Sequence, residues 1–451
     1  MGPHHRPGPR HLPPVDGGLP RPGHRGPADA GGNVTADPAV GRRSAGLGAP
    51  PAVAGGGWAQ PHAPGALKEG SSPGPARATQ PTRTKLQGLL LGLAAGDAAG
   101  WPAARHRAAR MPEWTRRLTR ELDTFAEQNA TTTLPVPIAL NQPPEPLRLG
   151  PSDDAEWAAY TATAVLAATV DGATDVRAAI DHHWQILAAQ IAAAADRAPE
   201  VESAQIPLRA RISVRAGLGN LATGLRPPAT GHDNPHFFDD AACVRAAVLA
   251  AVHPGAPQAA AELAEFDARY TNDGDGVHGA RAIAAAVAVA LAQPDGRSDV
   301  DEVVDAALDQ LPHETEIGRN ARLAVHLARH ADENGTFVLV PLLEHQIVDH
   351  VYSYGIAAAE TVPVALALAT AARGSLAEAV PAAACLSRVA DSAPALAGAL
   401  TGALGGAEGV PKSWRDACRT LSGCALPRLA GTDLVELGTE LADVLSRPRH
   451  N

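Results

Sequence analysis

The stretch Thr84-Lys-Leu-Gln-Gly-Leu-Leu-Leu-Gly-Leu-Ala-Ala-Gly-Asp97 decides the fold of this chain. Leucine and alanine fill it, and glycine recurs at every fourth position, at Gly88, Gly92 and Gly96. Glycine lowers helix stability by about 1 kcal/mol relative to alanine, so its regular use in a helix requires a packing reason. Residues four apart lie on the same helix face. We therefore predict a helix over 84–97 whose glycine face lets a second helix approach closely.

The sequence from Thr84 onward has a residue pattern typical of a helical protein. Alanine and leucine recur at helical spacing, and the alternating β-branched residues that mark strands are almost absent. This pattern predicts an all-α fold in one domain over 81–451, with amphipathic helices around a single core. Further helices are predicted over 176–193, 239–252, 257–270, 279–292, 299–310, 317–328, 338–349, 357–372, 376–386, 391–406, 414–421 and 433–445. Residues 101–150 are predicted to form a long loop that shapes the mouth of a pocket.

The first 80 residues differ sharply from the rest. They are rich in glycine, proline and arginine and have no apolar period. Such a segment cannot bury enough apolar surface to offset its ordering entropy, so we predict a disordered extension over 1–80. It resembles neither a secretory signal nor a transit peptide, and the apolar stretches 86–99 and 283–291 are too short to span a bilayer. We therefore expect a soluble cytoplasmic protein without a membrane partner.

Charge and cysteine usage exclude two further classes. The chain carries a formal net charge of −10, from 38 basic and 48 acidic residues. No global basic field is available to attract nucleic acid, so nucleic acid is not expected as a partner. The four cysteines lack the paired CxxC spacing of a structural zinc site and are interpreted as thiols, with a bridge between the last two left open for an oxidising compartment. They are Cys243, Cys385, Cys418 and Cys424.

Two distant acidic segments, Ser152-Asp153-Asp154 and Asp391-Ser392, each precede an alanine-rich helical run. Serine and aspartate are favourable at helix N-termini, so both segments are explained as ordinary helix starts. If folding brings them together, the same carboxylates form the oxygen cluster that Mg²⁺ prefers. Adjacent helical residues point about 100° apart, so Asp153 and Asp154 can serve different sides of one site. Spacing alone leaves both interpretations open.

Several segments, taken in order along the chain, resemble the ADP-ribosylglycohydrolase family. The resemblance extends over nearly all of 84–446. Beside the two acidic segments, it is carried by Leu-Gly-Leu-Ala-Ala-Gly-Asp-Ala-Ala-Gly-Trp-Pro (91–102), Asp-Ala-Arg-Tyr-Thr-Asn-Asp-Gly-Asp-Gly-Val-His-Gly-Ala (267–280), Tyr-Ser-Tyr-Gly-Ile-Ala-Ala-Ala-Glu-Thr-Val-Pro (352–363) and the small-residue run 397–406. It implies an orthogonally packed multi-helix fold and a hydrolase that cleaves a glycosidic ADP-ribose linkage with Mg²⁺ assistance. The substrate would be a small molecule or an ADP-ribosylated protein.

The resemblance also implies roles for individual residues. The metal ligands would be Ser152, Asp153, Asp154, Asp391 and Ser392. Asp154 and Asp153 would be the catalytic carboxylates. The substrate would be bound by Asp97, Trp101, Arg105, Asp275, Gly276, His278, Tyr352 and Tyr354.

The chain departs from the family pattern at three positions. Val389 stands where the family has aspartate, Ala155 where it has threonine, and Ala104 lies in the stretch where it usually has glutamate. The remaining carboxylates would hold one Mg²⁺ instead of two, or none. Arg105 would bind an anionic group directly in place of a metal ion, pair with Asp154, or lie exposed in its arginine-rich run. Two alternatives therefore stand beside the hydrolase: a metal-independent enzyme acting on another small molecule, such as a specialised metabolite, and a non-catalytic binding or structural protein.

Overall fold

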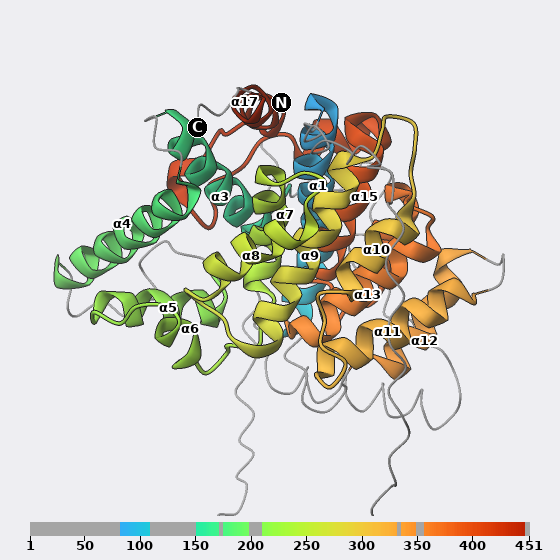
Figure 1. Cartoon of the computed structure of the whole chain (residues 1–451), viewed down its shortest axis with the longest axis horizontal. Helices are drawn as coiled ribbons and strands as arrows, with labels where there is room; N and C mark the ends of the chain where they lie inside the picture. The colour runs from blue at the N-terminus through green and yellow to red at the C-terminus, as the bar shows by residue number, and fades with distance from the viewer. Residues whose placement is uncertain are drawn as a thin grey trace, which may run out of the picture. The chain divides into compact units, whose positions relative to one another are not determined.

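The computed structural model describes residues 82–108, 150–170, 175–197, 210–331, 335–348 and 356–446. These residues form α-helices and short 3-10 turns (Figure 1). Strand-like pairing among them is limited to two isolated bridges, Asp239 with Ala357 and Thr420 with Asp433. The all-α prediction is confirmed. Residues 1–80 lie outside the described part of the chain, so the disordered extension stays a prediction.

The helices of the described residues follow one another along the chain in this order. They are α1 (Arg83–Ala108), α3 (Asp153–Val170), α4 (Val176–Arg197), α5 (Ile212–Ala222), α6 (Ala229–His232), α7 (Ala241–Leu249), η2 (Ala250–Val252), α8 (Pro257–Ala268), α9 (Gly274–Ala292), α10 (Val300–Leu308), α11 (Glu316–Arg329), η3 (Thr336–Val338), α12 (Leu339–Gln346), α13 (Ala358–Ala371), α14 (Leu376–Cys385), α15 (Ala393–Gly409), α16 (Lys412–Cys418), η4 (Pro427–Leu429) and α17 (Leu434–Leu445). Every helix predicted from the sequence has a counterpart in this series.

Helices α1 and α15 pack side by side at the centre of the domain (Figure 1). A methyl group on Gly88, Gly92 or Gly96 would overlap with backbone atoms of α15. Gly92 faces the carbonyl of Gly398, and Gly96 faces the carbonyl of Pro394. The facing position falls by four as the glycine position rises by four, so the two helices run antiparallel. The predicted close approach on the glycine face is confirmed, and it brings the end of the 84–97 stretch beside the start of α15.

Helix α1 is longer than the sequence predicted. It continues through Pro102 to Ala108, so the predicted loop over 101–150 is wrong for its first eight residues. Alanine and arginine are strong helix formers and extend the helix past the proline, which removes only one hydrogen bond. Gly100 also packs against the carbonyl of Ala390, which fixes this part of α1. Residues 109–149 lie outside the described part, so the pocket-shaping loop stays a prediction.

Helices α5 and α6 were not predicted. Helix α5 contains Gly217 and Gly219, which lower helix propensity. Gly217 has a packing reason, because a methyl group there would overlap with the carbonyl of Tyr270. Helix α6 has only four residues, too few for a periodic pattern to appear. Both helices therefore depend on contacts that the local sequence does not reveal.

Helix α9 is a core helix. It has 19 residues and is long and apolar enough to cross a membrane by length and composition. The apolar stretch 283–291, which the sequence analysis judged too short to span a bilayer, is only part of this helix. However, 72% of its apolar window is buried inside the fold, where it contacts α7, α8 and α10. Burial within the domain accounts for its apolar character. The cytoplasmic location stays a prediction.

The four cysteines form no disulfide. Cys243 and Cys418 are buried, Cys385 is half-buried and Cys424 is exposed. Burial raises the pKa of the Cys243 and Cys418 thiols, so both stay protonated at neutral pH. A protonated buried thiol packs as a small apolar side chain.

Candidate functional site

The two acidic segments meet beside the α1–α15 pair. The hydroxyl of Ser392 donates a hydrogen bond to Oδ2 of Asp154 across 2.8 Å. Asp154 lies in the first turn of α3, and Ser392 is the N-cap residue of α15. Both side chains are buried. Folding therefore brings these two segments together, which the sequence alone had left open.

A side chain that the sequence analysis did not single out, Arg211, lies among these carboxylates. Its Nε donates to Oδ1 of Asp240 at 3.1 Å, and its Nη2 lies 3.4 Å from Oδ1 of Asp154. Nη1 also donates to Asp391, and Nη2 to the Ser392 hydroxyl. The Arg211 side chain is only 8% exposed, whereas that of Asp391 is 15% exposed. We call these five residues the Arg211 cluster.

The chain next to Arg211 is hydrogen-bonded to the residues just before α7. Arg211 is the N-cap residue of α5, and two residues later the hydroxyl of Ser213 donates to Oδ1 of Asp239 at 2.7 Å. The same oxygen accepts from Nδ2 of Asn272 at 2.9 Å. Asp239 thus connects the segment of Arg211 to the segment of Asp240. It bonds to Ser213, two residues after Arg211, and its own neighbour Asp240 contacts Arg211 directly. The position of the guanidinium is set by buried hydrogen bonds and does not depend on surface side chains.

Asp97 caps helix α3 from a different helix. Its Oδ2 accepts from the backbone N–H of Ser152 at 2.6 Å and from that of Ala155 at 3.1 Å. The predicted capping side chain, Ser152, instead donates its hydroxyl to Oδ1 of Asp153 at 2.8 Å. Asp97 is therefore a structural link between α1 and α3. Its Oδ1 is buried and has no hydrogen-bond partner among the described residues.

Burial shifts the acid–base equilibria of this region. It raises the pKa of Asp97 to about 8, with a further contribution from the charge of Asp153, although the two backbone N–H groups oppose the shift. It also raises the pKa of Asp240 to about 7 and that of Asp154 well above its usual value, although Arg211 lowers both. One guanidinium cannot balance every carboxylate in a region of low dielectric. At neutral pH the site therefore retains bound protons.

The described part of the chain covers only some of the predicted substrate-binding residues. The indole Nε1 of Trp101 donates to the carbonyl of Gly150 at 3.0 Å, which ties the end of α1 to the segment before Ser152. Arg105 falls within α1, but its side chain lies outside the described part. Tyr352 and Tyr354 also lie outside it. The binding roles of these residues stay predictions.

Three of the predicted binding residues, Asp275, Gly276 and His278, lie near the start of α9. A methyl group on Gly276 would crowd the backbone of Phe237 and Asp239, so this glycine allows the close approach that its sequence context suggested. Oδ2 of Asp275 accepts from the backbone N–H of Ile317 at 3.4 Å, and burial raises its pKa. Burial lowers the pKa of the neighbouring His278. No hydrogen bond or ion pair of the described residues joins Asp275 or His278 to the Arg211 cluster, and their binding roles stay predictions.

The two substitutions at the acidic segments are apolar and buried. Val389 and Ala155 are 0% and 2% exposed, and both belong to the hydrophobic core. Where the family pattern would place a carboxylate and a hydroxyl, this chain therefore has packing groups without oxygen. The site has correspondingly fewer ligands for a hard cation.

As arranged, the Arg211 cluster does not fit a divalent metal ion. Mg²⁺ requires oxygen ligands in near-octahedral positions, whereas oxygens of Asp154, Asp391 and Ser392 already bond to a guanidinium. Ser152 and Asp153 bond to each other instead of joining this group. Within the described ranges, no group of three or more histidine, cysteine, aspartate or glutamate side chains is placed to hold a metal. Mg²⁺ binding stays a prediction from the resemblance.

Two members of the cluster, Asp240 and Arg211, were not predicted from the sequence. Only Asp240 belongs to a recognisable sequence pattern. Asp239-Asp240 precedes an alanine-rich helix, which repeats the pattern of Asp153-Asp154. A search for acidic pairs at helix starts would therefore have found Asp240. Arg211 is one of several arginines in its stretch, and nothing in the sequence distinguishes it.

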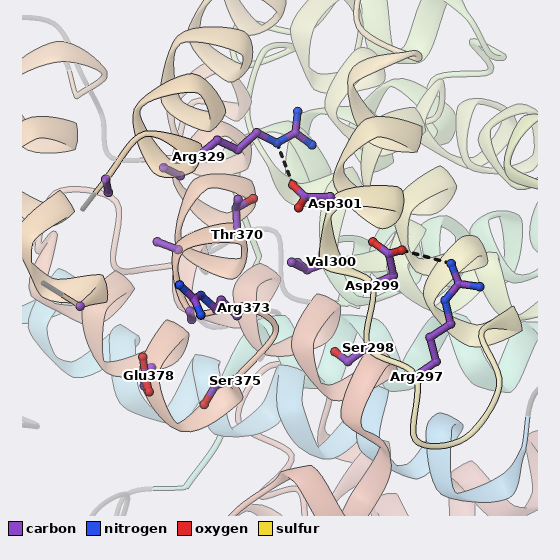
Figure 2. A pocket seen from close by; sticks show the side chains of 15 residues that line it. Arg297, Ser298, Asp299, Val300, Asp301, Arg329, Thr370, Arg373, Ser375 and Glu378 are labelled. Atoms are coloured by element: carbon purple, nitrogen blue, oxygen red, sulfur yellow. Dashed lines mark hydrogen bonds and ion pairs between the residues drawn. The ribbon is translucent and has the colours of Figure 1, made fainter. Parts of the chain in front are cut away.

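A separate hollow of about 1210 Å³ lies elsewhere in the domain (Figure 2). Its lining comes mainly from the start of α10, the end of α11 and the α13–α14 connection, and includes no residue of the Arg211 cluster. Two of the three arginines in its lining are paired with acids of the same surface: Arg329 with Asp301 at 2.8 Å, and Arg297 with Asp299 at 3.1 Å. Because the two acidic segments meet at the buried Arg211 cluster and not in this hollow, we place the candidate site at the cluster.

Comparison with known proteins agrees with the resemblance seen in the sequence. The family model of the ADP-ribosylglycohydrolases matches residues 78–449. A search of curated proteins gave no match. Among solved structures, the chain is similar to one from an "ADP-ribosylglycohydrolase-related protein complex", with 18% sequence identity and a TM-score of 0.44, over 80% of this chain and 98% of that one. Because the family model spans most of the sequence, this chain belongs to the ADP-ribosylglycohydrolase family.

Proposed function

We propose that this protein is a hydrolase that cleaves a glycosidic linkage of ADP-ribose, with the Arg211 cluster as its active site. Family membership supports a glycohydrolase-like activity. The observation that carries the proposal is the contact between Ser392 and Asp154, because it joins the two acidic segments of the resemblance in one buried site. Fold alone does not fix function, so the proposal rests on these side chains.

The chemistry of the cluster suits glycoside hydrolysis. This reaction adds water across the glycosidic bond: the hydroxyl goes to the anomeric carbon and a proton goes to the leaving group. It uses one protonated carboxyl as the acid and one carboxylate that activates water or attacks the sugar. Asp154 is the proposed acid, because burial favours its protonated form. Asp391, the more exposed carboxylate, is the proposed base.

The neighbouring residues would support this pair. Asp153, bonded to the Ser152 hydroxyl, adds negative charge near Asp97 and Asp154 and favours proton retention there. Oxocarbenium-like transition states carry positive charge on the sugar, and nearby carboxylates stabilise it. Asp153 therefore assists electrostatically in the proposed reaction.

The test is release of free ADP-ribose from peptides modified through an arginine nitrogen or a serine oxygen. The wild type should release ADP-ribose from at least one of these substrates. Asp154→Asn should lower the rate by about 10²-fold or more, the usual contribution of a positioned acid. Asp416→Asn, at an exposed side chain that pairs with Lys412, is the matched control and should leave the rate unchanged. Absence of release from every linkage would refute the proposed function.

A second candidate is a metal-independent reaction on another small molecule. The observation that favours it is the presence of Arg211 among the carboxylates, since a fixed cation changes which ligands the site accepts. Calorimetric titration with ADP-ribose separates the two candidates. Binding that weakens in Asp391→Asn supports the ADP-ribose hydrolase, whereas no binding together with turnover of another glycoside supports the second candidate. A protein that binds ADP-ribose without turnover would instead be a non-catalytic member of the family.

A further inference from the structure

Arg211 links three helix starts that are far apart in the sequence. It contacts Asp154 at the start of α3, Asp240 at the start of α7, and Asp391 just before α15. When they are ionised, these three side chains repel one another unless a cation lies between them. The guanidinium contacts all three, and the Arg211 side chain is 8% exposed. Its buried contacts thus hold the three segments in one arrangement.

A bound divalent ion would need the same oxygens. An ion ligated by Asp154 and Asp391 would lie within a few ångströms of the Arg211 guanidinium. Like charges a few ångströms apart repel strongly at a buried site, where the effective dielectric constant is well below that of water. The repulsion from a divalent ion is larger. The guanidinium and the ion therefore exclude each other from this position.

We propose that Arg211 serves as a built-in cation in place of a divalent metal ion, and that the site keeps its arrangement without metal. In this role Arg211 is a positioning residue that holds Asp154 and Asp391 relative to each other. The burial of apolar Val389 beside the second acidic segment agrees with this inference, because it leaves no additional carboxylate for an ion. The inference concerns the same site as the proposed function, and it rests on that proposal for the reaction that the site performs. Its test measures metal binding and unfolding instead of turnover, so the two proposals can fail separately.

The first experiment uses the unmodified protein after metal removal. Calorimetric titration with Mg²⁺, and separately with Mn²⁺, should give no binding at the site, and the melting temperature should be the same with EDTA as with millimolar Mg²⁺. Binding of Mg²⁺ or Mn²⁺ at one or two ions per chain that is lost in Asp391→Ala would overturn the inference. This experiment needs no variant of Arg211, so it decides the question even if such a variant does not fold.

The second experiment removes the guanidinium. Arg211→Ala should melt roughly 5–10 °C below the wild type, because it leaves buried carboxylates without a counter-charge. Millimolar Mg²⁺ should restore a large part of this loss, since the vacated oxygens become available to an ion. Arg211→Lys should retain more stability than Arg211→Ala and show less restoration. Equal melting of Arg211→Ala with and without Mg²⁺ would contradict the inference.

The matched control is Arg245→Ala. Arg245 is also buried, but its one ion-pair partner among the described residues is Asp267, at 2.7 Å. It also donates to the Thr271 hydroxyl and lies over the ring of Trp184. Arg245→Ala should lower the melting temperature, and Mg²⁺ should not restore it, because a single carboxylate does not form a site for a hard cation. Restoration in both variants would show a nonspecific effect of Mg²⁺ and would refute the proposed role of Arg211.

Discussion

The hydroxyl of Ser392 donates to Oδ2 of Asp154 across 2.8 Å, although 238 positions separate the two residues in the sequence. The contact joins the starts of α3 and α15, both of which pack against α1. One buried hydrogen bond thus connects both halves of the candidate site.

Ser392→Ala should lower kcat for ADP-ribose release about tenfold and leave KM nearly unchanged. Loss of a hydrogen bond to a charged or partly charged group corresponds to about 1.5 kcal/mol, and Ser392 orients the proposed acid without being required to contact substrate. Ser392→Thr, which keeps the hydroxyl, should retain most of the rate. Steady-state kinetics on the three proteins checks this. An equal loss in the alanine and threonine variants would show that the hydroxyl is not the cause.

Gly92→Ala should lower the free energy of unfolding by about 2–3 kcal/mol, because its methyl group would overlap with the carbonyl of Gly398 and force α1 and α15 apart. Gly219→Ala is the matched control within α5. Among the described residues outside its own stretch of helix, no heavy atom lies within 4 Å of its added methyl group. Alanine also favours the helix, so stability should rise by about 0.5–1 kcal/mol. Urea denaturation measures both changes. A loss of stability in both variants would indicate a general intolerance of alanine instead of a close helix contact.

Asp97 should make the stability of the wild type fall as pH rises. Burial raises its pKa from 3.8 to about 8, so between these values the folded state holds a proton that the unfolded state has lost. The stability due to this group is fully present below the unfolded pKa and is lost as pH rises through the folded pKa, by up to about 1.4 kcal/mol per pH unit.

Asp97→Asn should remove this contribution, because the amide keeps an acceptor for the backbone N–H groups of Ser152 and Ala155 but does not ionise. Urea denaturation across the pH range gives the difference between variant and wild type, which should grow in favour of the variant as pH rises. If the two profiles run parallel, Asp97 does not titrate in this range.

Glu156 anchors the segment before η4. Its carboxylate accepts from the backbone N–H groups of Cys424, Ala425 and Leu426, each at 2.8 Å, and the residue is fully buried. Glu156→Gln keeps only one accepting oxygen and should lower the free energy of unfolding by about 2–4 kcal/mol.

The control for this substitution is Glu408→Gln at a side chain that is 86% exposed. Guanidinium chloride denaturation should show almost no change there, because exposed charges contribute little. Equal stability of Glu156→Gln and the wild type would show that the three backbone groups find other acceptors.

The regular parts of the fold were accessible from the sequence because their causes are local. Helical periodicity places apolar residues on one face wherever it occurs. The glycines of α1 predicted a close helix partner, and the serine and aspartate pairs predicted helix starts. The predicted first helix ended too early, at Asp97, because strong helix formers continue it past Pro102. The prediction also missed α5, in which Gly217 is explained only by its contact with the distant Tyr270.

The sequence by itself determined the helical class and the acidic helix starts, because composition and spacing encode them directly, and the order of its motifs carried the resemblance to the family. Only the tertiary structure decided what surrounds those acids. It brought Asp240 and Arg211 to Asp154 and Asp391, and it made Asp97 the cap of α3. The physical reason is that electrostatic and hydrogen-bond energies depend on distance in space and on burial. Arg211 became the central cation of the site through packing, and no feature of its own sequence neighbourhood specifies that position.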